Sequence, residues 1–310
     1  MNRTATRLGS QAAKTPQTSK ESLGMLYGLI GVLVFSLTLP ATREAVGAFG
    51  VVVLGLGRAL VAAVFAALFL WWKRERFPQR GHLPGLGIIS IGAVFGFPFL
   101  TAWAMQRVPA SHGAVELALL PLATAAVSAL RHGERPSLLF WLCSAGGGLT
   151  VAAYAWFTGL GGMHAADLAL LGAVAIVAIA YAEGGWMANQ LGGWQVIAWS
   201  VVLSAPAAVI LLAADAVWAG TASLLPASWT AWAGLLYLGA GSQFFGFIAW
   251  YTGMGLGGVA RVSQMQYLQP FFTLLFSWLL LGEKLTFATV ATALAVVLWV
   301  MLGKWAAIRS

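Results

Sequence analysis

The sequence predicts an all-α integral membrane protein in which ten transmembrane helices form two inverted five-helix repeats. Three observations support this fold class: the composition, ten apolar segments of membrane-spanning length, and a motif that occurs once in each half. Of the 310 residues, 60% are hydrophobic and only 8% are charged, whereas soluble domains carry about 25% charged residues. This composition excludes a soluble enzyme, a disordered chain and a nucleic-acid-binding domain.

A helix needs roughly 20 mostly apolar residues to cross a bilayer. Ten segments satisfy this requirement, with short connections between them: 23–41, 50–72, 83–104, 112–130, 137–157, 166–188, 194–217, 229–254, 258–281 and 285–303. The polar residues 1–22 are expected to form a disordered cytoplasmic tail. A cleaved signal peptide over residues 1–42 is the alternative, and it is disfavoured because the apolar run exceeds the usual core of about 7–15 residues.

The distribution of basic residues predicts the orientation of the chain. With the N-terminus placed in the cytoplasm, thirteen Lys and Arg fall on the inner side, three fall in outer loops, and Arg58 lies within the second span. The positive-inside rule therefore places both termini in the cytoplasm. The net charge of +8 then faces anionic lipid, so we expect membrane lipid as a partner and no nucleic acid.

A repeated motif divides the chain into two units. The segments LLPLATAAVSALRHGERPS (119–137) and LQPFFTLLFSWLLLGEKLT (268–286) align without a gap at an offset of 149 residues. The aligned landmarks are Pro121 with Pro270, Gly133 with Gly282, and Glu134 with Glu283. The units are predicted to span residues 23–158 and 159–310. Because each holds an odd number of spans, the second enters the membrane from the opposite side.

Inverted units can exchange conformations and so open a central site first to one side of the membrane and then to the other. Pro121 and Pro270 lie near the middles of spans four and nine, and each removes a backbone donor and frees the carbonyl four residues earlier. For Pro270 that carbonyl belongs to Gln266. Paired helix breaks predict a binding site at the repeat interface; the alternative is a plain proline kink.

Polar and aromatic side chains inside the spans predict a substrate cavity with aromatic walls and a few amide and hydroxyl groups. Its candidate residues are Ser36, Thr38, Phe95, Phe99, Trp103, Tyr181, Glu183, Gln243, Trp250, Tyr251, Ser263, Gln266 and Tyr267. Such a lining suits a small amphipathic or zwitterionic solute, while interhelical hydrogen bonding explains any one of these residues equally well. Glu183 could carry a proton, pair with an amine, or cap the inner end of span six.

The remaining titratable residues suggest structural roles. His112 and Glu116 lie one turn apart at the outer end of span four and are expected to form an exposed pair, with proton relay as the alternative. Arg58 is expected to bind backbone carbonyls, and Cys143 to be an inert buried thiol. His and acidic residues show no metal-ligand clustering, and no P-loop or protease motif occurs. The sequence therefore predicts no catalytic residue, no metal and no cofactor.

The ten spans, the two repeats and the pattern L-x-P…L-L-L-G-E-x-L-T at 268–286 resemble the EamA-type transporters of the drug/metabolite transporter superfamily. The first-half copy, Leu120-Pro121 to Gly133-Glu134, is similar. The resemblance implies a secondary carrier of the bacterial inner membrane, with a central cavity lined by spans one, three, four, six, eight and nine. The paired Gly-Glu motifs end spans four and nine, so we expect Glu134 and Glu283 to be structural turn residues and not substrate ligands.

Within that superfamily the chain looks most similar to the aromatic amino acid exporters, although its segment G-A-V-E-L-A-L-L-P lacks the asparagine and tryptophan of that branch. We therefore expect a transporter that exports amino acids, aromatic and other small ones, by alternating access without ATP, with a monomer as the expected state. The alternatives are export of other metabolites or of cationic drugs, which Glu183 could bind. A membrane-embedded enzyme is less favoured because no catalytic cluster is visible.

Overall fold

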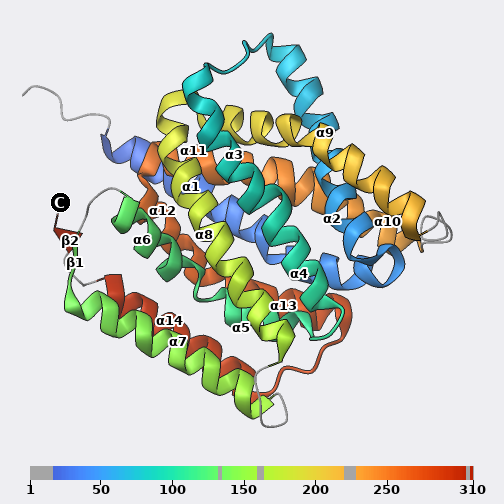
Figure 1. Ribbon diagram of the computed structural model, residues 1–310. Coiled ribbons are helices and arrows are strands. Elements are labelled where there is room, and N and C mark those ends of the chain that lie inside the picture. Colours follow the sequence, from blue (N-terminus) through green and yellow to red (C-terminus); the bar gives the residue numbers. More distant parts are fainter. Residues whose placement is uncertain (1–16, 132–134, 159–163, 220–227, 305–307, 310) are drawn as a thin grey trace, which may run out of the picture.

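The computed structural model describes residues 17–131, 135–158, 164–219, 228–304 and 308–309, and these residues are almost entirely helical (Figure 1). Most of the predicted N-terminal tail lies outside the described residues, as do Gly133 and Glu134 of the first motif. The two short strands β1 (Arg135–Pro136) and β2 (Ile308–Arg309) pair antiparallel. The all-helical class predicted from the composition is confirmed for the described part of the chain.

The first half contains seven α-helices and two short helices of other types. They are α1 (Gln17–Ser36), α2 (Thr38–Lys73), the 3₁₀-helix η1 (Arg80–His82), α3 (Leu83–Ile89), the π-helix η2 (Ser90–Gly96), α4 (Phe97–Met105), α5 (Ala110–Leu117), α6 (Leu120–Arg131) and α7 (Leu138–Thr158). Helix α2 bends at Gly50, whose φ of 71° is a left-handed conformation that glycine adopts readily. This bend coincides with the predicted start of span two.

The second half repeats this pattern of long and interrupted helices. Its elements are α8 (Ala165–Leu191), α9 (Gly193–Ala219), α10 (Trp229–Leu236), the π-helix η4 (Tyr237–Gly246), α11 (Phe247–Gly257), α12 (Val259–Ser263), the 3₁₀-helix η5 (Gln264–Leu268), α13 (Gln269–Leu281) and α14 (Phe287–Lys304). Each of the ten predicted spans therefore coincides with helical structure.

Among the described residues, six helical segments are long and apolar enough to cross a membrane, and two further apolar helices are shorter. The first segment, Lys20–Lys73, joins predicted spans one and two because the connection between them is itself helical. Predicted span nine is divided among three helices, and its apolar part, Met265–Leu281, is short. The protein is thus a multi-pass membrane protein, and the count of ten spans stays a prediction.

Both repeat prolines follow a helix break. Helix α5 ends at Leu117 and α6 begins at Leu120, just before the buried Pro121. Similarly, the 3₁₀-helix η5 separates α12 from α13, just before Pro270. A proline is favoured near a helix start because a backbone N–H at that position would have no partner within the helix, so its absence costs nothing. The carbonyl of Gln266, however, is not left free as expected, because it accepts a hydrogen bond from the backbone N–H of Gln269.

The π-helices also occupy corresponding positions in the two halves. Moved by the repeat offset of 149 residues, η2 falls on residues 239–245, which lie inside η4. Isolated π-helical turns are uncommon and often occur at functional sites. Spans three and eight therefore share a local irregularity that the sequence motif did not reveal.

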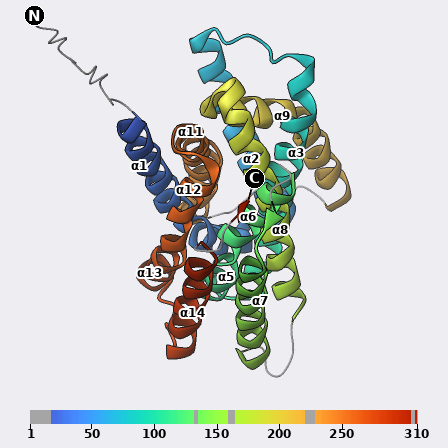
Figure 2. The same cartoon turned by 90° about the vertical axis from the view of Figure 1, so that its left-hand side faces the viewer.

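Close packing of α1 against α11 depends on glycine (Figure 2). A Cβ atom added at Gly24 would lie 2.5 Å from the backbone nitrogen of Gly257, and one at Gly253 would lie 2.9 Å from the carbonyl oxygen of Gly24. Small residues allow membrane helices to approach in this way. At the edge of the molecule α7 and α14 lie side by side (Figure 1), and Trp299 Nε1 donates to Thr150 Oγ1 at 3.1 Å.

Candidate functional site

A group of buried polar side chains joins α1, α2 and η4. We call Ser36, Thr38, Arg58 and Ser242 the polar layer. The hydroxyl oxygens of Thr38 and Ser242 lie 2.8 Å apart, and Arg58 Nη2 donates to Ser242 Oγ at 3.4 Å. Ser36 Oγ donates to the carbonyl of Val32 at 2.7 Å. All four members are buried. Arg58 was expected to bind backbone carbonyls, but its described hydrogen bond goes to the hydroxyl of Ser242.

Several buried polar atoms, one of them in the polar layer, have no partner among the described residues. Gln243 is 0% exposed, and its Nε2 donates to the carbonyl of Ala93 at 3.1 Å while its Oε1 has no partner. Gln266 is 1% exposed, and neither atom of its amide has a partner. Trp250 Nε1 and Arg58 Nε are also without one. Each such atom costs roughly 1–3 kcal/mol, so each of these side chains is a candidate for binding a polar ligand.

Five rings from α1, α8 and α11 pack against one another, and we call them the aromatic cluster: Phe35, Tyr181, Phe247, Trp250 and Tyr251. The ring centroids of Phe35 and Phe247 are 5.0 Å apart, and those of Tyr181 and Trp250 are 5.6 Å apart. Tyr251 donates its hydroxyl to the carbonyl of Ala180 at 3.2 Å. The structure therefore brings three of the predicted cavity residues together and adds Phe35, which the sequence reasoning missed although it precedes Ser36.

Phe99, Trp103 and Ser263, which were also predicted to line the cavity, have their described contacts with residues outside the aromatic cluster. Phe99 packs on α2, where its ring lies 3.2 Å from the position of a Cβ at Gly55. Trp103 stacks with Arg107, whose guanidinium carbon is 3.6 Å from the ring centroid. Ser263 donates to the carbonyl of Val259 at 2.7 Å. Phe95 and Tyr267 are partly buried.

Glu183 forms an ion pair that the sequence did not predict. Its Oε2 lies 2.6 Å from Nη2 of Arg131, at the end of α6. The carboxylate is nearly buried, whereas the arginine is 43% exposed. This contact joins α6 to α8 and gives the carboxylate a cation from within the chain.

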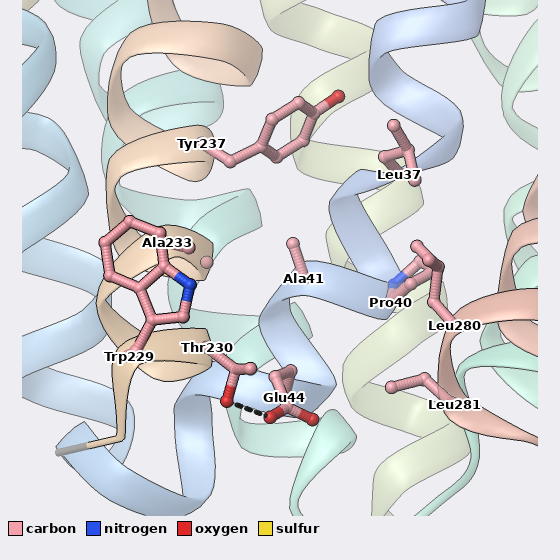
Figure 3. Close-up of a pocket in the computed structure, with 11 residues that line it drawn as sticks. Leu37, Pro40, Ala41, Glu44, Trp229, Thr230, Ala233, Tyr237, Leu280 and Leu281 are labelled. Atoms are coloured by element: carbon pink, nitrogen blue, oxygen red, sulfur yellow. Dashed lines mark hydrogen bonds between the residues drawn. The ribbon is translucent and has the colours of Figure 1, made fainter.

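A pocket of about 430 Å³ opens between α2, α10 and the end of α13 (Figure 3). At one end Thr230 Oγ1 donates to Glu44 Oε1 at 2.7 Å, and at the other end the ring of Tyr237 faces Leu37. Tyr237 donates its hydroxyl to the carbonyl of Val34 at 2.6 Å. None of the predicted cavity residues lines this pocket. Pro40 and Glu44, directly after the first apolar run, were the available sequence signal.

A second polar cluster, the carboxylate–histidine triad, consists of His112, Glu116 and Asp167. His112 Nε2 lies 3.2 Å from Glu116 Oε1 and 2.8 Å from Asp167 Oδ1. The expected exposed pair is therefore wrong, because the side chain of His112 is only 11% exposed and that of Glu116 is fully buried. Asp167 also accepts the backbone N–H of His164 at 2.6 Å, as part of a capping box at the start of α8.

The triad also corrects the expectation that His and acidic residues do not cluster. One ligand atom from each member lies within 4.8 Å of the others, so the set could hold a metal ion. Asp167 is 55 residues from His112 in the chain, and only the packing of α8 against α5 joins them. The position of Asp167 at the start of an apolar segment indicated a helix cap, but it did not indicate the contact with His112.

Glu283 links the two halves of the chain. Its two carboxylate oxygens accept the backbone N–H groups of Ala110 and Ser111, each at 2.8 Å. These N–H groups belong to the first turn of α5, where the helix dipole favours a negative charge. The second copy of the Gly-Glu motif thus caps a helix of the first half, which agrees with its expected structural role.

Comparisons with known proteins identify the family. The EamA-like transporter family matches the chain twice, over residues 22–157 and 164–302. The chain is 41% identical over 287 residues to the uncharacterized transporter YdeK of Bacillus subtilis (strain 168), covering 91% of this chain and 97% of that protein. It is 25% identical over 276 residues to a protein of Streptantibioticus cattleyicolor named "Probable terminal-alkyne amino-acid exporter", covering 82% of this chain and 84% of that protein.

A solved crystal structure shares the fold, with a TM-score of 0.64 at 18% identity, covering 90% of this chain and 94% of that one. The matched family and both sequence relatives are transporters and not enzymes. The double match also agrees with the repeat found in the sequence. The helical architecture, the buried polar layer and these matches lead to one conclusion: the chain belongs to the EamA-like transporter family.

Proposed function

We propose that this protein is a secondary transporter that exports amino acids, aromatic and other small ones, across the bacterial inner membrane by alternating access. In this proposal ten spans form two inverted units, residues 23–158 and 159–310, and both termini lie in the cytoplasm. The excess of Lys and Arg on the inner side supports that orientation. The transporter acts as a monomer in contact with lipid and uses no ATP.

The observation that carries the proposal is the pair of buried glutamines, Gln243 and Gln266, whose amides keep unpartnered hydrogen-bonding atoms. Such amides suit the amino and carboxyl groups of a zwitterion. The neighbouring rings suit an apolar side chain, since small-molecule sites combine apolar walls with a few placed polar groups. Gln243 lies one helical turn before Phe247 of the aromatic cluster.

The corresponding irregularities of the two halves support alternating access. Helix breaks precede both Pro121 and Pro270, and both spans three and eight contain a π-helix. In transporters built from inverted repeats, interrupted helices at corresponding positions surround the substrate. The cap that Glu283 provides for α5 connects one such interrupted helix to the other repeat.

Two features support a ranking of the cargo classes. The relative named as an amino-acid exporter favours amino acids. The alternative of cationic drugs depends on Glu183, but this carboxylate already has a cation partner in Arg131. We therefore rank amino acids above cationic drugs and other metabolites.

Counterflow in proteoliposomes tests the proposal. Vesicles with purified protein are loaded with one unlabelled amino acid, and the entry of labelled phenylalanine, threonine or methionine is followed. We expect accumulation above that in empty vesicles, reduced by Gln243→Ala and by Gln266→Ala. The matched control is Gln106→Ala, because this glutamine is exposed in the turn after α4.

The outcomes separate the site from the function. Full counterflow by both buried-glutamine variants would show that these amides do not bind the cargo. Absence of counterflow for every amino acid, with wild-type protein that elutes as a folded species, would refute amino-acid transport.

A further inference from the structure

Arg58 is a buried cation without a described anionic partner. Its side chain lies within α2 and is 2% exposed. The ion pairs found among the described residues involve His112, His164 and Arg131, and none involves Arg58. Its described hydrogen bond goes to Ser242 Oγ at 3.4 Å, and its Nε has no partner.

This arrangement is costly unless an anion completes it. A guanidinium stays protonated and presents five N–H donors in a fixed plane. A charge removed from water is tolerated when it is paired, and ionisable residues inside a membrane usually mark the path of a substrate or ion. The neutral hydroxyls of Ser242 and Thr38 provide hydrogen bonds but no compensating charge.

The surroundings of Arg58 connect the pocket to the aromatic cluster. Tyr237, whose ring lines the pocket (Figure 3), belongs to the same π-helix as Ser242, which accepts the hydrogen bond from Arg58. The hydroxyl of Ser242 also lies 2.8 Å from that of Thr38, which follows Phe35 of the aromatic cluster by three residues. Ser242 therefore connects Arg58 to the π-helix whose first residue lines the pocket, and through Thr38 to the segment that carries Phe35.

We propose that Arg58 binds the carboxylate of the transported molecule, so that the transporter selects carboxylate-bearing cargo. A planar guanidinium pairs with a carboxylate through two parallel hydrogen bonds, which fixes both charge and orientation. Ser242 supplies an additional hydroxyl beside the pair, and the rings of Tyr181 and Trp250 contact the apolar part of the cargo. This inference rests on the proposed function and specifies its substrate class.

The first experiment removes the carboxylate from the cargo and leaves the protein unchanged. Phenethylamine and phenylalanine methyl ester compete with labelled phenylalanine in wild-type counterflow. We expect each to compete at least about tenfold more weakly than phenylalanine, because the buried guanidinium is left without its anion. Equal competition by the amine or by the ester would overturn the proposal, whatever happens to the variants.

The second experiment changes the arginine. Arg58→Gln should raise the KM for phenylalanine by at least about tenfold and reduce the preference for phenylalanine over phenethylamine. Arg58→Lys, which keeps the charge, should retain part of both. The control is Arg107→Gln, which removes an exposed guanidinium. An unchanged KM and unchanged preference in folded Arg58→Gln protein would overturn the proposal.

A binding measurement separates this inference from the transport proposal. Phenylacetate should raise the thermal unfolding temperature of the wild type but not that of Arg58→Gln, and benzylamine should raise neither. If the wild type carries no amino acid but phenylacetate still stabilises it through Arg58, amino-acid transport fails and the carboxylate site stands. If amino acids are carried and phenylacetate stabilises both proteins equally, the carboxylate site fails.

Discussion

Replacing Glu283 by glutamine tests whether the repeated Gly-Glu motif holds the two halves together. In the wild type, both carboxylate oxygens accept backbone N–H groups of α5, from Ala110 and Ser111, at 2.8 Å. A glutamine keeps one acceptor oxygen and replaces the other by an NH₂ group that cannot accept. Glu283→Gln therefore removes one charge-assisted hydrogen bond and leaves the other as a neutral one.

The magnitude follows from these two bonds. A hydrogen bond to a charged group contributes about 1.5–3 kcal/mol and a neutral one about 0.5–1.5 kcal/mol, and the helix dipole adds about 0.3–1 kcal/mol for the negative charge. Since the bonds are only partly buried, we take the lower half of these ranges. The expected loss is about 3 kcal/mol for Glu283→Gln and about 4 kcal/mol for Glu283→Ala.

The assay is thermal unfolding of the detergent-solubilised protein, followed by tryptophan fluorescence and by the monodisperse fraction in size-exclusion chromatography. A loss of about 3 kcal/mol lowers the midpoint by roughly 5 °C. Lys284→Gln is the matched control, because the neighbouring side chain is exposed and its replacement should leave the midpoint unchanged. If Glu283→Gln and Lys284→Gln have the same unfolding midpoint, the carboxylate does not stabilise α5 and the reasoning is refuted.

Two further substitutions test buried contacts. His112→Ala leaves the carboxylates of Glu116 and Asp167 without their shared imidazole, which should cost about 3–5 kcal/mol in thermal unfolding; adding Glu116→Gln should recover part of the loss, and a wild-type midpoint for the single variant would contradict this account. A Cβ at Gly193 would overlap the backbone of α11, whereas one at Gly47 meets nothing within 4 Å. Gly193→Ala should therefore reduce the yield of monodisperse protein and Gly47→Ala should not; equal yields would show that α9 can move away from α11.

Local chemistry determined most of what the sequence revealed about this protein. Backbone groups in a bilayer must be hydrogen-bonded within their own segment, so long apolar runs become helices without help from distant residues. The breaks before Pro121 and Pro270 are also local, because a proline ring excludes one backbone donor wherever the helix packs. The repeat, the helical positions and the family were accordingly readable from the sequence.

The contacts around the candidate site were decided only by tertiary structure. Asp167 joins His112, and Glu283 caps α5, across separations of 55 and 172–173 residues. No helical periodicity links such positions, because packing between helices sets which faces meet. For the same reason Arg58 could be recognised in the sequence as a charge within a span, but its lack of a described anionic partner, and its hydrogen bond to Ser242 of η4, emerged only from the folded chain.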